Sequence, residues 1–301
     1  MSEHSSIKIT ASYPPPKHLL RDLGISITFK GREQASLRAP VGPEVRGVDG
    51  AIRPGVLATL TDVLAGSLTI RAIYPDWIAT SDLSLFSTRA FVQGTLVARG
   101  TLLRAGRTRV FIETEIFEES EGATASAKGM FSDAGIGGQG PAPIGYGIVT
   151  VARIPQEGQT MPAGLDEEAG STLTFTAEGS GLKKPILEQI GLKVLDARAG
   201  VVEVELLDYL KNSFGALQGG TVSILAEVAG ECAGQAVSSK PLLTRNLRIQ
   251  YLSQGRVGPF RTRARVLYES GDSVLTRVEV VDCGDDNRLV AIALNTSAGP
   301  S

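Results

Sequence analysis

Two acidic residues stand alone in apolar stretches and are the first candidates for chemistry. From Pro54 through Ile70 the only charged residue is Asp62, and Glu227 occupies a matching place in a second apolar stretch. An ionised carboxylate in such a segment is costly unless it is paired, hydrogen-bonded or hydrated. Each acid is therefore either a structural cap or ion-pair partner, or a general base or nucleophile whose pKa is tuned by burial.

The segment before the second acid could bind an oxyanion. It reads Asn212-Ser213-Phe214-Gly215-Ala216-Leu217-Gln218-Gly219-Gly220 and leads into a helical stretch. Two glycines at a helix start let a substrate approach free backbone N–H groups, and the helix dipole favours negative charge there. The pattern fits an oxyanion hole, although a plain glycine turn before a helix is the commoner reason for it.

Histidine and cysteine are too few for several classes of site. The chain has two histidines, His4 and His18, and two cysteines, Cys232 and Cys283. Ser-His-Asp and Cys-His systems need an imidazole beside the nucleophile, and zinc sites draw on several His and Cys residues. We therefore expect no metal site. If the protein is an enzyme, we expect carboxylates and backbone amides to carry out its acid–base catalysis. So few cysteines also indicate a reducing compartment, which we expect to be the cytoplasm.

The elements that must position these residues occur twice. Residues 50–55 correspond to 215–220 at a shift of 165, Asp62 corresponds to Glu227 at the same shift, and 82–85 correspond to 246–249 at a shift of 164. A shift this constant indicates duplication with small loop changes. We predict two copies, 16–133 and 183–298, joined by a Gly- and Pro-rich linker at 134–182 in which 148–151 can form an extra strand.

Each copy has the pattern of one buried helix followed by antiparallel strands. Apolar residues recur at helical spacing over about 55–72 and 220–236, and both stretches are apolar on nearly all sides, so they must be covered. Alternating runs at 110–117 and 274–281 predict half-buried antiparallel strands. The sequence therefore predicts an α+β fold in which each copy wraps an antiparallel sheet around a long helix.

Charge and hydropathy exclude two kinds of partner. The chain has 301 residues with 30 basic and 32 acidic side chains, a net charge of −2, which is not the basic excess of a nucleic-acid-binding protein. We find no apolar run that approaches the ~18 residues needed to cross a bilayer. We therefore expect neither nucleic acid nor membrane as a partner.

The motif in the second copy resembles a known signature. Asn-x-x-Gly-x-Leu-Gln-Gly-Gly followed by Leu225-Ala226-Glu227 resembles hotdog-fold acyl-CoA thioesterases of the phenylacetate-pathway (PaaI-like) branch. There an acid stands eight residues after the first paired glycine and an Asn seven before it, as Glu227 and Asn212 stand relative to Gly219. Gln218 replaces the histidine common in that branch. The resemblance implies a tandem of two hotdog domains and is clearest over 183–298.

In that family the Asn and the glycine amide come from one hotdog and the acid from the helix of its partner. The resemblance therefore implies a first composite site in which Asn212 and Gly219 face Asp62 of the other copy. Thr80 stands eighteen residues after Asp62, where family members often carry a hydroxyl that helps to hold the attacking water.

The corresponding second site would combine Gly47 and Pro54 with Glu227. Proline has no N–H, Gly47 replaces the Asn, and Arg245 stands where the hydroxyl would be. Losing one oxyanion donor typically costs ~10²–10³ in turnover. We hypothesise that the first site is active and the second degenerate.

The resemblance implies hydrolysis of an acyl-CoA thioester without a cofactor. Asp62 would act on water or as the nucleophile, Gly219 would hold the thioester carbonyl, and Asn212 would orient the substrate or the water. The alternative is a non-catalytic acyl-CoA- or acyl-ligand-binding hotdog protein, which the broken second site and Gln218 favour. A hotdog dehydratase or hydratase is disfavoured, because the chemistry of those enzymes resembles that of His-dependent sites and neither copy supplies a suitably placed histidine. Because hotdog proteins often pair further, we expect a homodimer.

Two arginine-rich stretches without acidic residues, Leu83 to Ile112 and Lys240 to Tyr268, could bind the phosphates of coenzyme A. They fit a solvated strand face or an interface better, so we assign no binding site to them. We likewise expect Trp77 to contribute to packing rather than to line an acyl pocket.

Overall fold

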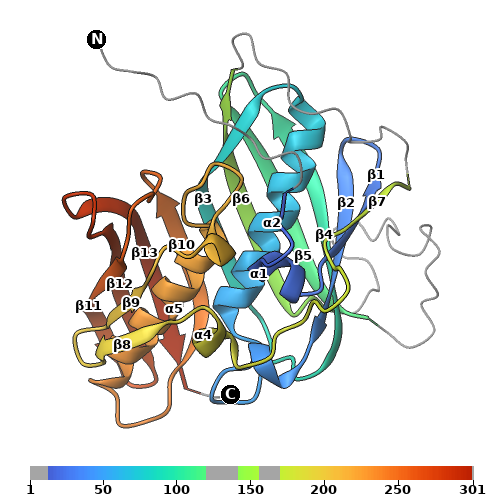
Figure 1. The fold of residues 1–301 in the computed structure, drawn as a ribbon. Coiled ribbons are helices and arrows are strands. Elements are labelled where there is room, and N and C mark those ends of the chain that lie inside the picture. The colour runs from blue at the N-terminus through green and yellow to red at the C-terminus, as the bar shows by residue number, and fades with distance from the viewer. Residues whose placement is uncertain (1–12, 120–141, 156–169, 300–301) are drawn as a thin grey trace, which may run out of the picture.

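The computed structural model of the chain describes residues 13–119, 142–155 and 170–299 (Figure 1). The helices are α1 (Leu19–Asp22), α2 (Pro54–Ile73), α4 (Ile186–Gln189) and α5 (Gly219–Gln235), with single 3₁₀ turns η1 (Pro43–Val45) and η2 (Asp208–Leu210). The strands of the first half are β1 (Ser26–Lys30), β2 (Gln34–Val41), β3 (Trp77–Ser87), β4 (Gly94–Ala105), β5 (Arg109–Glu118), β6 (Gly145–Ile154) and β7 (Thr172–Thr174). Those of the second half are β8 (Lys193–Asp196), β9 (Val201–Val204), β10 (Leu243–Tyr251), β11 (Phe260–Ser270), β12 (Ser273–Asp282) and β13 (Arg288–Ala298).

The strands described form one antiparallel sheet whose order repeats about its centre. The order is β7-β1-β2-β4-β5-β6-β3-β10-β13-β12-β11-β9-β8. Outward from the β3–β10 junction, β6, β5, β4, β2 and β1 of one half correspond to β13, β12, β11, β9 and β8 of the other. Each half carries one long helix, α2 or α5, on the inner face of its strands. The predicted α+β architecture is therefore confirmed.

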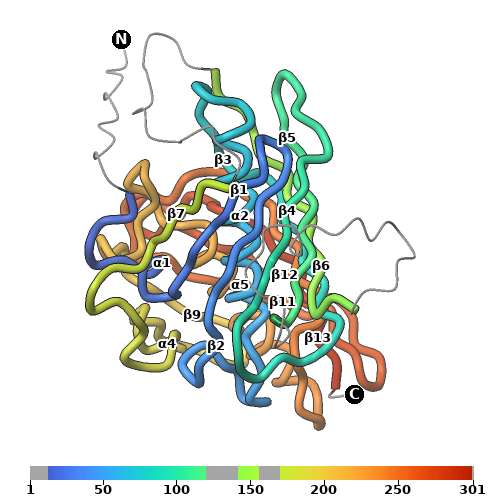
Figure 2. The backbone as a smooth tube through the Cα atoms, turned by 90° about the vertical axis from the view of Figure 1, so that its right-hand side faces the viewer, coloured from blue at the N-terminus to red at the C-terminus, as the bar shows by residue number. Residues whose placement is uncertain are grey.

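The two long helices are buried because they are apolar on nearly all sides. In α2, Pro54 occupies the first turn, where its missing N–H costs nothing. Figure 2 shows α2 and α5 enclosed between the sheet and the segment that carries α1 and β7. By length and by a mean hydropathy of 1.5, α2 could cross a membrane, so the expectation that no apolar run is long enough was wrong. In this fold 78% of that stretch is buried in the protein interior.

The halves meet closely at two points. β3 pairs with β10 from Asp82 opposite Gln250 to Phe86 opposite Asn246, which makes the sheet continuous. The helices approach where each lacks a side chain: a Cβ on Gly220 would lie 2.3 Å from Thr59 Cγ2, and one on Gly55 would lie 2.8 Å from the Ile224 Cα. Only glycine permits this approach, and it fixes the start of each helix against the other.

The range predicted as a linker, 134–182, contributes two strands to the sheet. β6 pairs with both β3 and β5, and it extends well beyond the extra strand anticipated at 148–151. β7 pairs with β1 at the edge. β6 holds the place in the first half that β13 holds in the second.

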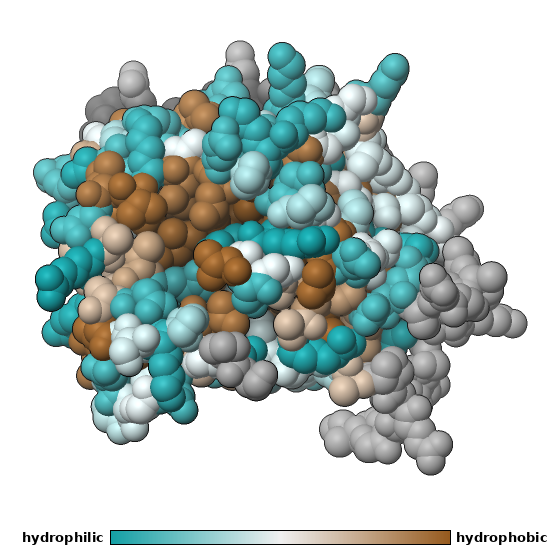
Figure 3. Space-filling model, turned by 90° about the horizontal axis from the view of Figure 1, so that it is seen from below, coloured by the Kyte–Doolittle hydropathy of each residue, from teal (hydrophilic) through white to brown (hydrophobic). Residues whose placement is uncertain are grey.

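Apolar side chains also reach the surface of the second half. Figure 3 shows a hollow of apolar surface seen from below. Large apolar residues that this half exposes include Val194 and Leu195 in β8, Leu267 and Tyr268 in β11, and Val237 after α5.

Candidate active site

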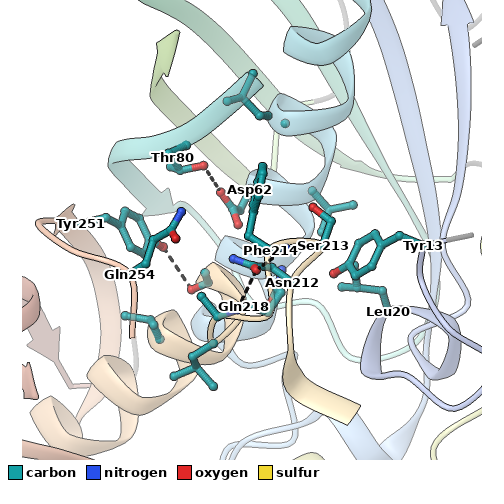
Figure 4. A pocket seen from close by; sticks show the side chains of 18 of the residues that line it. Tyr13, Leu20, Asp62, Thr80, Asn212, Ser213, Phe214, Gln218, Tyr251 and Gln254 are labelled. Atoms are coloured by element: carbon teal, nitrogen blue, oxygen red, sulfur yellow. Dashed lines mark hydrogen bonds between the residues drawn. The ribbon is translucent and has the colours of Figure 1, made fainter. Parts of the chain in front are cut away.

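A cavity of about 400 Å³ lies where the two halves meet. Its walls come from α2, the start of β3, the N-terminal segment and β7 of the first half, and from residues 212–219 and the end of β10 of the second. Most of the lining is apolar, while polar side chains gather at one end (Figure 4). These polar residues are Asp62, Thr80, Asn212, Gln218, Tyr251 and Gln254. The size and mixed lining are typical of a small-molecule site.

Asp62 projects from α2 into this cavity and is held by one side chain. Thr80 Oγ1 donates a hydrogen bond to Asp62 Oδ1 at 2.7 Å. Burial raises the pKa of the Asp62 carboxyl from its ordinary 3.8 to about 6, and the Thr80 hydrogen bond partly opposes that rise. A carboxyl with a pKa near 6 exchanges a proton readily close to neutral pH, which suits a general base.

Gly219 is the first residue of α5, and the Asp62 carboxylate lies directly against it. A Cβ placed on Gly219 would be 2.7 Å from Asp62 Oδ2. As the first helical residue, Gly219 has an N–H with no acceptor inside the helix, and the helix dipole makes this end positive. The structure thus brings an acid from one half and a helix N-terminus from the other to the same end of the cavity.

Asn212 and Gln218 shape the loop between them. Asn212 Oδ1 accepts hydrogen bonds from the Phe214 N–H at 2.9 Å and the Ala216 N–H at 3.0 Å, which leaves the side-chain NH₂ as the group able to contact a ligand. Gln218 Oε1 accepts from the Thr221 N–H at 3.1 Å and caps α5. The residue that departs from the family pattern therefore has a structural role here.

Two tyrosines that sequence reasoning missed also line the cavity. Tyr251 donates a hydrogen bond to the Gly219 carbonyl at 3.1 Å and lies 3.1 Å from Ser223 Oγ. Burial, together with the Asp62 carboxylate, holds the pKa of Tyr251 well above its ordinary value, so the phenol stays protonated. Tyr13 stands across the cavity from Tyr251 (Figure 4). No sequence pattern marks either tyrosine, because only the fold brings β10 and the N-terminal segment to α2.

Aromatic rings form part of the apolar wall. Trp77 lines the cavity, contrary to the expectation that it serves packing alone, and its ring lies 4.6 Å from that of Phe214. Phe29 and Phe175 contribute further rings. The wall therefore joins aromatic side chains from both halves.

The residues of the predicted second site also lie together, but they enclose little space. Gly47, Pro54, Glu227 and Arg245 line a cavity of about 40 Å³, a tenth of the first. The loops before the two long helices are built alike, since the Gly47 N–H donates to the Ala51 carbonyl and the Asn212 N–H to the Ala216 carbonyl, both at 2.7 Å. The difference between the two cavities therefore lies in the side chains.

Arg53 fills the second site from the position that Gln218 holds in the first. Its Nε lies 3.2 Å from Glu227 Oε2, and its Nη2 lies 3.0 Å from Glu231 Oε2. Arg53 and Glu227 are almost fully buried. Burial raises the pKa of Glu227, and the guanidinium, shared between two carboxylates, only partly opposes this. Glu227 is thus engaged in an ion pair, whereas Asp62 faces open space.

The histidine within the described residues serves the structure. His18 Nδ1 accepts from the Leu20 N–H at 3.1 Å, so the proton is on Nε2, which donates to the Lys211 carbonyl at 2.8 Å. Burial lowers the pKa of this imidazole. His4 lies outside the described residues. Over residues 13–119, 142–155 and 170–299, no three His, Cys, Asp or Glu side chains are grouped to hold a metal ion.

The arginines of the two acid-free stretches lie away from the large cavity. Arg261 pairs with Glu203 at 2.6 Å, and Arg248 pairs with Asp82 at 3.2 Å on the outer face of the sheet. None of these arginines lines the large cavity, while Arg89 and Arg245 line the small one.

Comparison with known proteins agrees with this fold. Residues 214–288 match the family model described as thioesterase superfamily. The tesB protein of Mycobacterium avium subspecies paratuberculosis is similar in structure, with a TM-score of 0.57 and 10% identity over 94% of this chain and 98% of that one. A hot dog fold protein of unknown function from Alicyclobacillus acidocaldarius is also similar, with a TM-score of 0.55 and 10% identity over 93% of this chain and 97% of that one.

An acyl-ACP thioesterase from Bacteroides thetaiotaomicron gives a TM-score of 0.52 and 13% identity, over 88% of this chain and 97% of that one. No curated protein matches the sequence. The chain therefore has the hotdog fold, and its residues 214–288 match the thioesterase superfamily.

Proposed function

We propose that the protein is a thioesterase that hydrolyses an acyl-CoA thioester in the large cavity between its halves. The observation that carries the proposal is the contact of Asp62, from α2, with Gly219, at the start of α5, at the polar end of an apolar cavity. A thioester needs these parts: a donor for the carbonyl oxygen, an acid beside the carbonyl carbon, and an apolar space for the acyl chain.

The chemistry follows from the charges of these groups. The Gly219 N–H, at the positive end of α5, donates to the thioester carbonyl oxygen and stabilises the negative charge that develops there. Ionised Asp62 takes a proton from water, whose oxygen then bonds to the carbonyl carbon. The C–S bond breaks, the thiol leaves with that proton, and the acid product remains. Attack by the Asp62 carboxylate itself, followed by hydrolysis of the anhydride, uses the same geometry.

The neighbouring residues orient these two groups. Thr80 holds Asp62 Oδ1 and so leaves Oδ2 on the side of Gly219. Tyr251 holds the carbonyl of Gly219, and the Asn212 NH₂ contacts the substrate. The walls formed by Trp77, Phe214 and their apolar neighbours receive the acyl chain.

The second site takes no part in turnover. Pro54 supplies no N–H, and Arg53 occupies the space beside Glu227. Each chain therefore has one active site, whose acid comes from the first half and whose carbonyl donor comes from the second.

Release of free thiol from a panel of acyl-CoA and acyl-carrier-protein thioesters tests the proposal. We expect turnover that Asp62→Asn abolishes and that Glu227→Gln, the matched change in the second site, leaves in place. Loss of turnover in Glu227→Gln with full activity in a folded Asp62→Asn variant would contradict the assignment. No release from any thioester, together with tight binding of one, would instead identify the non-catalytic acyl-ligand-binding protein.

A further inference from the structure

One face of the second half of α2 forms a wall of the large cavity. The α2 residues that line it are Asp62, Val63, Gly66, Ser67 and Ile70. From Asp62 to Ile70 the helix rises by about 12 Å. Earlier in α2 the helix packs against α5 instead, since a Cβ on Gly220 would lie 2.3 Å from Thr59 Cγ2. The cavity therefore extends from the acid toward the C-terminal end of α2.

The start of β3 lies alongside this stretch of α2 and forms a facing wall. Thr80 donates its hydrogen bond to Asp62, and two residues earlier in the strand Ile78 lies beside Gly66. Among the described residues outside the helix, a Cβ on Gly66 would come within 4 Å of Ile78 alone, with 3.6 Å to its Cδ1. Gly66 thus leaves open space one turn past the acid. We call the part of the cavity between Gly66 and Ile70 the α2 channel.

The corresponding space in the second half is filled. At the shift of 165 between the copies, Gly66 corresponds to Glu231. Glu231 lines the small cavity, and its Oε2 lies 3.0 Å from Arg53 Nη2. These two side chains occupy the place that is open beyond Asp62 in the first half. A glycine at position 66 is therefore one of the differences that make one cavity large and the other small.

The walls of the α2 channel are apolar apart from Ser67. Ile70 on the helix, Ile78 on β3 and Phe29 on β1 all line the cavity here. A thioester substrate has two arms, the acyl chain and the carrier, and the amide groups of the carrier arm need hydrogen-bond partners. Walls of this kind suit the acyl chain, whose burial in them is favourable.

Phe29 closes the far end of the α2 channel. Arg71, the residue after Ile70, places its Cζ 4.6 Å from the centre of the Phe29 ring. Arg71 is almost fully buried, donates a hydrogen bond to Ser171 Oγ at 2.9 Å, and does not itself line the cavity. A chain that passed Phe29 would have to displace this buried guanidinium, which is costly. The length of the channel is therefore fixed.

We infer that Gly66 sets the substrate class of the site, because it admits a straight acyl chain that runs along α2 and ends at Phe29. The inference rests on the proposed function, which places the thioester carbonyl beside Asp62. Three bonds of an extended chain span about 3.4 Å, so about 12 Å takes roughly ten bonds. The preferred substrate is therefore a medium-chain thioester of about ten carbons. Gly66 stands midway between Asp62 and Ile70, so about half of the chain lies beyond it.

Steady-state kinetics with straight-chain acyl-CoA thioesters of two to sixteen carbons test the inference. In the wild type, kcat/KM should peak near ten carbons. Gly66→Leu closes the channel to about five methylenes, and each contributes about fourfold to kcat/KM. The ratio of kcat/KM for the ten-carbon to that for the four-carbon thioester should therefore fall by roughly 10²–10³-fold. Ile70→Ala, which lengthens the channel, should move the peak to a longer chain.

Two smaller substitutions form a matched pair. Gly66→Ala adds a methyl 3.6 Å from Ile78 Cδ1, and Gly234→Ala in α5 adds one 3.4 Å from Leu242 Cδ1, so both make ordinary contacts. Of the two glycines, Gly66 lines the large cavity and Gly234 does not. Gly66→Ala should lower the ten-carbon to four-carbon ratio, and Gly234→Ala should leave it in place. This pair tests the inference even where leucine at position 66 prevents folding.

Calorimetric binding of S-alkyl-CoA thioethers, which cannot be hydrolysed, separates the channel from the chemistry. If the wild type releases no thiol, yet binds the ten-carbon thioether more tightly than the four-carbon one and loses this preference in Gly66→Leu, the proposed hydrolysis fails and the channel stands. A wild-type peak at two to four carbons would overturn the inference and leave hydrolysis in place. A loss in Gly66→Leu that is equal at every chain length would also overturn it, because the channel would then hold the carrier arm.

Discussion

Replacing Asp62 by asparagine should stabilise the protein while removing its activity. Asparagine has nearly the same shape, and its Oδ1 can still accept the hydrogen bond from Thr80. It carries no charge, so the folded protein no longer has to bury an ionised carboxylate. The expected gain in stability depends on pH, because the cost in the wild type depends on whether Asp62 is ionised.

The magnitude follows from the pKa of Asp62, which burial raises from 3.8 to about 6. Each pKa unit is worth about 1.4 kcal/mol, so the full effect is about 3 kcal/mol. Because the folded-state pKa exceeds the unfolded one, the folded protein binds more protons between these two pH values. Wild-type stability therefore falls as pH rises through 4 to 6, and the full cost is present above pH 6.

Denaturant unfolding of both proteins at pH 4.5, 6 and 8 measures this difference. The advantage of Asp62→Asn should be smallest at pH 4.5, should grow with pH, and should level off above about pH 7. The lowest pH is the internal control, since Asp62 is mostly protonated in the folded wild type there. A stability difference that stays constant across this range, or that shrinks as pH rises, would refute the assignment of Asp62 as a destabilised, catalytically poised acid.

Further expectations concern turnover and the second site. Turnover should rise with pH about a midpoint near 6, and Thr80→Val should move that midpoint upward, because the Thr80 hydrogen bond lowers the pKa of Asp62; a pH–rate profile measures both. Gly219→Pro copies Pro54 and removes the N–H, and should lower kcat by about 10²–10³-fold relative to Gly219→Ala, which adds the same Cβ 2.7 Å from Asp62 Oδ2 but keeps the N–H; equal kcat values for these two variants in steady-state assays would exclude the Gly219 N–H as the carbonyl donor. Arg53→Gln leaves the buried Glu227 carboxylate without its ion-pair partner and should cost about 3–5 kcal/mol in denaturant unfolding, with kcat unchanged for the folded fraction. Extending a short acyl chain by one methylene should raise kcat/KM about fourfold until the cavity is filled, as about 0.8 kcal/mol per group implies; a flat series would mean that the chain lies in water.

Local pattern was sufficient to predict the main elements of the fold. The helices predicted around Asp62 and Glu227 agree with α2 and α5 to within one residue at each end. Their burial was predictable because a helix that is apolar on nearly all sides must be covered. The alternating runs became β5 and β12 for the same kind of reason. The strand β6 was only partly anticipated, since the glycines and prolines around it are typical of a linker.

The part of the candidate site that could be predicted consists of residues that belong to the repeated motif. Asp62 and Gly219 come together because each stands at a fixed place in a copy, and the copies pack symmetrically. Tyr251 and Arg53 could not be predicted this way. A tyrosine at the end of a strand and an arginine before a helix have no distinctive spacing, and their partners lie in distant parts of the fold.

The junction between β3 and β10 has a consequence for how activity depends on concentration. Where an acid and a carbonyl donor belong to separate subunits, dilution separates them and activity falls by mass action. Here backbone hydrogen bonds within one chain hold α2 beside α5. Specific activity should therefore be the same at nanomolar as at micromolar enzyme.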